Sequence, residues 1–262
     1  MTERAILCGL GRIGWRGFES NGALPTHGST LEDMSGLRVC IVAGVDIDPV
    51  ARHHFQTATH RHVYETLTAA LAAESPSIVV IATPPETHAD LVCEAAACRS
   101  VKGIVCEKPM ADTVADCRRM IDACAGKALL VAHQRRYEQR HRLLRAFLKS
   151  ETLGKSLGAV AWFNGGFLNN GTHAADTIRF LVGDDTMSRL FESRGFGVRV
   201  ACQYGMVELR SDGDLEPGYL KAMYEDLLDC METGHTPECS GEDGLEAVRL
   251  ALAAKEANEQ AA

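Results

Sequence analysis

The segment Gly9-Leu10-Gly11-Arg12-Ile13-Gly14 has the glycine spacing of a dinucleotide-binding turn. The first glycine permits a tight turn, the second lets the backbone approach a pyrophosphate, and the third lets a helix pack closely on a strand. The motif follows an apolar run and opens a helix-compatible stretch, whose first N–H groups would face the phosphates. We therefore expect Gly9, Gly11, Arg12, Ile13 and Gly14 to bind a dinucleotide cofactor.

A carboxylate at the end of the next strand-like run favours NAD over NADP. Asp46 can accept hydrogen bonds from the ribose hydroxyls, and its charge repels a 2′-phosphate. It lies 32 residues after Gly14 (46 − 14 = 32), against a usual separation of roughly 20. We attribute the excess to a polar, turn-rich insertion around residues 21–36. Asp46 as a plain turn residue is the alternative, and Arg12 and Arg52 leave NADP open.

Two further segments end apolar runs, where the carboxyl ends of parallel strands bind ligands. Thr83, Pro84 and His88 follow one run, and Glu107 and Lys108 follow the next. Partly desolvated beside an oxidised nicotinamide, the lysine would have a pKa below its reference of about 10.4 and could exchange a proton with a substrate hydroxyl. The alternatives are a structural Pro-Pro turn and a solvated surface lysine.

The elements that must position these residues alternate between strand-like and helix-like over residues 1–132. Continuous rather than alternating apolarity is typical of a parallel sheet covered on both faces. The strand-like runs are Ala5–Cys8, Leu37–Val45, Ser77–Ala82, Val101–Cys106 and Ala128–Ala132, and the helix-like stretches are Ile13–Phe18, Pro49–Thr57, Leu67–Ala73, Thr87–Cys98 and Val114–Cys124. This pattern predicts an α/β fold, with an N-terminal Rossmann domain built on a doubly wound parallel sheet.

Residues 133–262 lose the regular alternation and predict a smaller α+β domain for substrate binding and oligomerisation. The strand-like pieces are Ala159–Phe163, Val198–Gln203 and Met206–Arg210, and the helix-like stretches are Glu138–Lys149, His173–Leu181, Tyr219–Glu232 and Asp243–Gln260. We expect two domains in contact, since no long linker separates them.

Composition excludes several classes of protein. A net charge of −8 over 262 residues argues against a nucleic-acid partner. No run approaches the roughly 20 apolar residues of a membrane span, and Met1 to Leu10 lack the features of a secretory signal. We expect a cytoplasmic protein without a membrane partner. The ten cysteines include no Cys-x-x-Cys pair, so we expect mainly buried free thiols and no metal site.

Taken together, the motifs resemble the Gfo/Idh/MocA oxidoreductase family. The glycine turn, Ala82-Thr83-Pro84-Pro85 with His88, and Glu107-Lys108-Pro109 carry the resemblance in the first half. In the second half it rests on His133-Gln134-Arg135-Arg136-Tyr137, on Gly171-Thr172-His173-Ala174-Ala175-Asp176 and on Glu242-Asp243-Gly244-Leu245-Glu246-Ala247. These matches occur in order and span nearly the whole chain.

The resemblance implies an NAD(P)-dependent dehydrogenase or reductase of a sugar, cyclitol or related polyhydroxy compound. In the family the lysine contacts the reacting hydroxyl and the helix histidine acts as acid or base, which here implies Lys108 and His173 as catalytic residues. Asp176 would orient the imidazole or bind a substrate hydroxyl, and Arg136 and Tyr137 would contact substrate or the edge of the cofactor. His173 as a structural histidine is the alternative.

Two departures from the family pattern bear on activity. Family members often carry Asp four residues before the helix histidine, and this chain has Asn169, which can bind a substrate hydroxyl but cannot accept a proton. The stretch 188–215 is abbreviated, and the sheet to which it belongs often supplies the subunit interface, so a homo-oligomer is an open expectation. Two other functions therefore stay open: a redox-neutral, NAD-dependent glycosidase and a non-catalytic dinucleotide-binding protein.

Overall fold

The first sheet is parallel and has six strands. The computed structural model describes residues 2–17, 25–36, 38–211 and 218–261. The strands are β1 (Glu3–Cys8), β2 (Val39–Val45), β3 (His62–Tyr64), β4 (Ile78–Ile81), β5 (Gly103–Cys106) and β6 (Ala128–Val131), in the order β3-β2-β1-β4-β5-β6. Every residue of β4 and β5 is buried, as the continuous apolar runs predict. The strand order reverses direction at β1, so the carboxyl ends of β1 and β4 form the crevice of a Rossmann fold.

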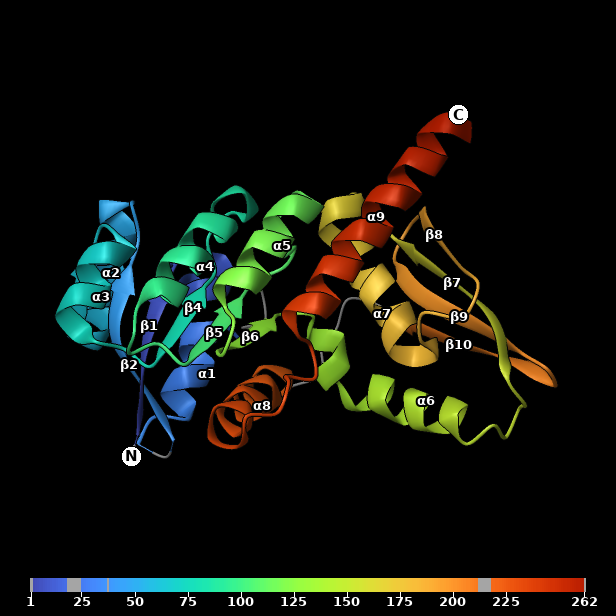
Figure 1. The fold of residues 1–262 in the computed structure, drawn as a ribbon, viewed down its shortest axis with the longest axis horizontal. Coiled ribbons are helices and arrows are strands. Elements are labelled where there is room, and N and C mark those ends of the chain that lie inside the picture. Colours follow the sequence, from blue (N-terminus) through green and yellow to red (C-terminus); the bar gives the residue numbers. More distant parts are fainter. Residues whose placement is uncertain (1, 18–24, 37, 212–217, 262) are drawn as a thin grey trace.

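Helices cover both faces of this sheet. They are α1 (His27–Asp33), α2 (Pro49–Thr59), α3 (Leu67–Glu74), α4 (His88–Ala97) and α5 (Val114–Ala123). Helices α3, α4 and α5 pack side by side, whereas α1 packs beside α8 (Tyr219–Thr233), a helix from near the end of the chain (Figure 1).

The first crossover differs from the prediction. After the glycine turn the chain forms only a five-residue π-helix, η1 (Arg12–Arg16), instead of a helix over 13–18, and Phe18 lies outside the described residues. The segment interpreted as a turn-rich insertion contains α1. Thr26 begins that helix with a capping box, in which its hydroxyl accepts from the Ser29 N–H and the Ser29 hydroxyl accepts from the Thr26 N–H. The insertion therefore forms part of the core, with Leu31 fully buried.

A second, mixed sheet forms the other half of the molecule (Figure 1). Its strands are β7 (Ser156–Phe163), β8 (Ser188–Glu192), β9 (Phe196–Cys202) and β10 (Gly205–Ser211), in the order β10-β9-β7-β8. One face packs on α7 (Thr172–Val182) and α6 (Gln139–Lys149) lies beside α7. Sequence patterning missed β8, because most of its side chains are exposed and give no apolar run. None of the helices in the described part of the chain has the length and apolarity that a bilayer span requires.

The last two helices return to the first sheet. Tyr224 and Leu227 of α8 and Val248 of α9 (Gly241–Ala261) are buried in the same apolar core as the six parallel strands. Between these helices the chain pairs with the edge of β6, where the Val131 N–H donates to the Cys239 carbonyl at 3.0 Å. A division at residue 132 therefore separates the two sheets, but residues of α8 and α9 that follow it belong to the core of the first sheet. Helix α9 runs obliquely between the halves and packs on both α5 and α7 (Figure 1).

Candidate active site

The glycine turn meets three different spatial requirements. Gly9 has φ +93, and a Cβ there would lie 2.5 Å from the backbone of Ala82. A Cβ on Gly14 would lie 1.9 Å from the Gly9 carbonyl oxygen, whereas one on Gly11 would meet no described atom within 4 Å. Gly9 and Gly14 are thus fixed by close packing, and Gly11 leaves open space at the end of β1. This is the cradle that a dinucleotide pyrophosphate requires, so the residues present fit the cofactor.

Asp46 lies at the end of β2, beside that turn. Its Oδ2 accepts from the Leu10 N–H at 2.7 Å and its Oδ1 from the Asp48 N–H at 2.9 Å. These bonds fix the carboxylate against the glycine turn and leave further lone pairs for ribose hydroxyls. Arg12 is exposed at the start of η1 and Ile13 is half-buried, and their contacts with the cofactor remain predictions.

His88 joins two of the predicted cofactor segments. It is fully buried, and its ring nitrogens lie 2.9 Å from the Thr83 carbonyl and 3.0 Å from the Pro109 carbonyl. Thr83 also accepts a hydrogen bond from the Thr87 hydroxyl. The sequence analysis expects His88 to bind cofactor, but the structure places its ring between the segment that begins with Thr83 and Pro84 and the turn at Lys108. The ring therefore joins these two segments, and a role in cofactor binding stays a prediction.

Glu107 is held by a buried chain of hydrogen bonds that the sequence analysis missed. The Lys108 N–H donates to Glu107 Oε2 at 3.0 Å, and His27 Nε2 donates to Oε1 at 3.0 Å. The other ring nitrogen, Nδ1, lies 2.7 Å from the Tyr224 hydroxyl. Burial alone would raise the pKa of Glu107, but the bond from His27 and the nearby Lys108 ammonium lower it. Helices α1 and α8 together thus fix the backbone that carries Lys108.

The side chain of Lys108 reaches across to the second domain. Its Nζ donates to Asn169 Oδ1 at 2.6 Å, from the short π-helix η4 (Phe167–Gly171) that precedes α7. Burial lowers the pKa of Lys108, the charge of Glu107 opposes this, and Arg135 lowers it further. A lysine with a lowered pKa can serve as a proton acceptor nearer neutral pH. The structure thus brings Lys108 and Asn169 into direct contact.

A pair of buried imidazoles lies at the start of α7. His133 Nδ1 and His173 Nδ1 are 3.4 Å apart, and both rings are shielded from solvent. Burial lowers the pKa of His133 to about 4. Burial, followed by the charges of Arg135 and Lys108, lowers the pKa of His173 well below its usual value. Both rings are therefore neutral near pH 7, the state in which an imidazole can accept a proton.

Arg135 has a buried guanidinium whose hydrogen bonding is incomplete. Among the described residues, nothing accepts a hydrogen bond from its Nε or Nη1. Its guanidinium lies 3.6 Å from the centre of the Phe196 ring, and burial lowers its pKa to about 10. His133 Nε2 and Glu138 Oε1 are also buried without a partner. Because an unsatisfied buried polar group is costly, these atoms mark a place where a ligand or water must complete the hydrogen bonding. The two adjacent arginines at 135 and 136 were the sequence signal for this group, and the sequence prediction names only Arg136 as a site residue.

Arg136, Tyr137 and Asp176 are engaged elsewhere. Arg136 Nε donates to both carboxylate oxygens of Asp176, and its Nη2 lies 2.9 Å from Asp243 Oδ1. The Tyr137 hydroxyl donates to Asp226 on α8 at 2.7 Å. We expected Asp176 to orient the His173 imidazole, but its carboxylate binds Arg136 instead. The three side chains join the second domain to α8 and α9. Their role in substrate binding remains a prediction that this arrangement does not favour.

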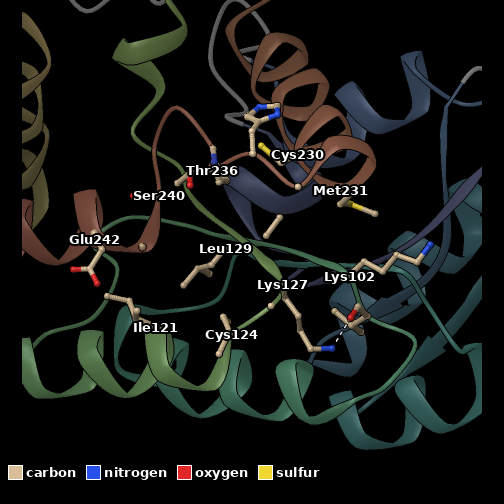
Figure 2. A pocket seen from close by; sticks show the side chains of 18 of the residues that line it. Lys102, Ile121, Cys124, Lys127, Leu129, Cys230, Met231, Thr236, Ser240 and Glu242 are labelled. Carbon is tan, nitrogen blue, oxygen red and sulfur yellow. Dashed lines mark hydrogen bonds between the residues drawn. The ribbon is translucent and has the colours of Figure 1, made fainter.

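A large hollow lies away from these groups. It has a volume of about 790 Å³ and is lined by Val101, Lys102, Lys127 and Ala128, at the amino ends of β5 and β6. The glycine turn and Lys108 lie at the opposite, carboxyl edge of the sheet. Figure 2 shows side chains of α5, β6 and α8 around the hollow, among them Ile121, Leu129 and Met231.

Comparison with known proteins identifies the family. Residues 4–134, half of the chain, match the Gfo/Idh/MocA family model, described as an oxidoreductase family with an NAD-binding Rossmann fold. The chain belongs to this family, and its first domain is an NAD-binding Rossmann domain.

Two curated relatives share a name. Inositol 2-dehydrogenase of Rhizobium meliloti (strain 1021) is 30% identical over 205 residues, which cover 72% of this chain and 57% of the relative. The enzyme of the same name from Salmonella typhimurium (strain LT2) is 28% identical over 161 residues, or 60% and 44% of the two chains. The chain thus spans about half the length of the curated relatives it matches.

Solved structures share the complete fold. A putative myo-inositol dehydrogenase from Sinorhizobium meliloti 1021 matches with a TM-score of 0.82 and 22% identity, covering 100% of this chain and 98% of the other. An oxidoreductase from Agrobacterium radiobacter, in complex with NAD⁺, L-tartaric acid and magnesium, matches with a TM-score of 0.81 and 18% identity, covering 100% and 98%. At these identities the likeness extends to the fold alone.

Proposed function

We propose that this protein is an NAD-dependent oxidoreductase acting on a CH–OH group of a sugar, a cyclitol or a related polyhydroxy compound. The observation that carries the proposal is the contact between Lys108 Nζ and Asn169 Oδ1. It brings a lysine of lowered pKa to the carboxyl edge of the sheet that bears the glycine turn. The relatives named inositol 2-dehydrogenase support the substrate class.

Each group in this cluster has a role in the reaction. The nicotinamide, when bound, accepts or supplies the hydride at the carbinol carbon. Neutral Lys108 accepts the hydroxyl proton during oxidation, and its ammonium returns the proton during reduction. Neutral His173 is the alternative acceptor of that same proton. Asn169 binds a hydroxyl beside Lys108, while the unpartnered donors of Arg135 bind further substrate oxygens.

Cofactor choice and assembly follow from the same geometry. The fixed carboxylate of Asp46 favours the ribose hydroxyls of NAD over the 2′-phosphate of NADP. The face of the second sheet turned away from α7 carries Trp162 stacked on Phe191, and Phe191 is 41% exposed. An aromatic cluster of this kind suits a subunit interface, so we include a homo-oligomer in the proposal.

The test has two stages. First, calorimetric titration with NADH and NADPH, after mass spectrometry for retained cofactor, should give tighter binding of NADH. Second, NADH formation should be followed with myo-inositol and a panel of sugars, comparing wild type with Lys108→Ala. We expect at least a tenfold loss of turnover with nearly unchanged affinity for NADH. Equal turnover in both proteins would exclude Lys108 from the mechanism.

Two other outcomes would favour the alternatives. Tightly retained NAD with hydrolysis of a glycoside and no net NADH formation would favour a redox-neutral glycosidase. Binding of NADH without turnover of any substrate in the panel, and without any effect of Lys108→Ala on ligand binding, would favour a non-catalytic dinucleotide-binding protein.

A further inference from the structure

Three side chains with metal-binding atoms meet at the end of α8. Asp226 and Cys230 are one helical turn apart on the same face of the helix. His235 follows Gly234, which ends the helix with φ +78. One ligand atom from each of these three residues lies within 4.8 Å of the other two. The sequence analysis predicted no metal site, since the spacing Asp-x3-Cys-x4-His matches no familiar metal motif.

Asp226 is anchored through one oxygen and leaves the other for the cluster. Its Oδ2 accepts from the Tyr137 hydroxyl at 2.7 Å and from the Glu238 N–H at 2.8 Å. Its Oδ1 lies 3.8 Å from Cys230 Sγ and 3.5 Å from His235 Nε2. Carboxylates that bind metals are commonly oriented in this way by outer hydrogen bonds.

His235 is oriented so that its Nε2 faces the carboxylate. The Thr233 hydroxyl donates its proton to the Asp229 carbonyl at 2.7 Å. At 2.6 Å from His235 Nδ1 this hydroxyl can therefore only accept, so Nδ1 carries the hydrogen. Nε2 is then the ring nitrogen that faces Asp226 Oδ1. A cation bound by both atoms, or a proton shared between them, satisfies this pair.

The spacing is close to that of the ligand atoms around a transition metal. Zinc bonds of about 2.0–2.3 Å in tetrahedral geometry separate the ligand atoms by about 3.3–3.8 Å. The Asp226–His235 and Asp226–Cys230 separations of 3.5 and 3.8 Å agree with this range, and the third pair, Cys230 and His235, lies within 4.8 Å. We propose that Asp226, Cys230 and His235 bind a zinc-class divalent cation, with water as the fourth ligand.

The hollow at the amino ends of β5 and β6 gives access to this site. Cys230 and His235 both line it, and Figure 2 shows Cys230 at its wall. His235 is about half exposed, whereas Cys230 is buried. Burial raises the pKa of the Cys230 thiol to about 12, so the metal must displace that proton. Binding of one M²⁺ forms one metal–sulfur bond and releases one H⁺.

The bound metal would join α8 to the segment that leads into α9. This segment pairs with the edge of β6 through the Cys239 carbonyl. Helix α8 also carries Tyr224, whose hydroxyl contacts the His27 ring that in turn contacts Glu107. The metal would therefore stabilise the docking of α8 and would touch neither cofactor nor substrate. A cation that binds only the folded state raises Tm by mass action.

Cobalt(II) titration of the reduced, metal-free protein tests the proposal. We expect saturation at one equivalent, with a thiolate-to-cobalt charge-transfer band and tetrahedral ligand-field bands. Zinc should displace the cobalt and raise the Tm of the wild type. Cys230→Ser should lose the charge-transfer band, and His235→Ala should weaken binding at least tenfold. The matched control is His54→Ala, an exposed histidine on α2, which should bind as wild type does.

Wild-type protein that develops no charge-transfer band would overturn the proposal, and this result does not depend on any variant. A band that survives unchanged in His235→Ala, or in Cys230→Ser, would assign the metal to other thiols and overturn it equally.

Discussion

Lys108 and Asn169, from opposite domains, are joined by a hydrogen bond of 2.6 Å between Nζ and Oδ1. The partner of the lysine is thus a neutral amide, which stabilises an ammonium less than a carboxylate would. Burial lowers the pKa of Lys108, and Asn169 leaves it low. Asn169, which stands where family members often have Asp, therefore favours the neutral, proton-accepting form of Lys108.

Asn169→Asp should reverse this effect. A carboxylate at hydrogen-bond distance raises the pKa of Lys108, so the rise of oxidation rate with pH should move upward by about one pH unit. The measurement is kcat against pH, with Asn164→Asp as control, since it adds the same charge on an exposed side chain. A profile that is unchanged in Asn169→Asp would show that Lys108 is not the titrating group.

Gly11→Val should separate cofactor binding from folding. No described atom lies within 4 Å of a Cβ at this position, so the variant should unfold at the wild-type urea midpoint. Its side chain fills the space for the pyrophosphate, and affinity for NADH should fall at least 100-fold. Gly14→Ala is the contrasting variant, because its Cβ would overlap the Gly9 carbonyl and should lower the stability itself.

Arg135→Met should weaken substrate binding without loss of stability. The substitution removes two buried donors, Nε and Nη1, that have no acceptor among the described residues, and a buried unsatisfied group costs about 1–3 kcal/mol. We expect KM to rise at least tenfold and the free energy of unfolding not to fall. Arg189→Met, on the exposed surface of β8, serves as control. Lower stability with unchanged KM would assign Arg135 to the core alone.

Tyr224→Phe should lower the stability, because it removes the hydrogen-bond partner of the buried His27 ring. Loss of the hydroxyl leaves His27 Nδ1 buried without its hydrogen-bond partner, which costs about 1–3 kcal/mol. Tyr204→Phe, at a side chain that is 79% exposed, should change the free energy of unfolding by less than about 0.5 kcal/mol. Urea denaturation of both variants measures the difference, and equal stabilities would contradict the buried hydrogen-bond chain.

Mild acid should destabilise the protein through His133. Its pKa is about 4 in the folded state against 6.5 when exposed, so the unfolded chain binds more protons between these values. Stability is therefore lost as pH falls below about 6.5, and His133 alone accounts for about 2 kcal/mol between pH 7 and pH 5. Urea midpoints at the two pH values should differ less in His133→Asn than in wild type, and equal differences would contradict the lowered pKa.

The parallel sheet and the glycine turn could be predicted because their signals are local. Apolar runs define β4 and β5, and the three glycines of the first turn lie within six consecutive residues, 9–14. The hydrogen bonds to His27 could not be predicted, since they join residues 80 and 197 positions apart. Helix α1 was hidden in a polar segment, although Thr26 and Ser29 carried a capping signal. The pairing of Arg136 with Asp176 likewise depends on which side chains the folded domains bring together.

The return of α8 to the first sheet also constrains how the chain can be made and divided. Tyr219, Tyr224 and Leu227 complete the core around strands that end by residue 131. A fragment cut after residue 132 would expose this apolar face and the edge of β6, and should aggregate. During synthesis, the Rossmann core stays incomplete until the residues of α8 have left the ribosome, so the domain made first cannot finish folding first.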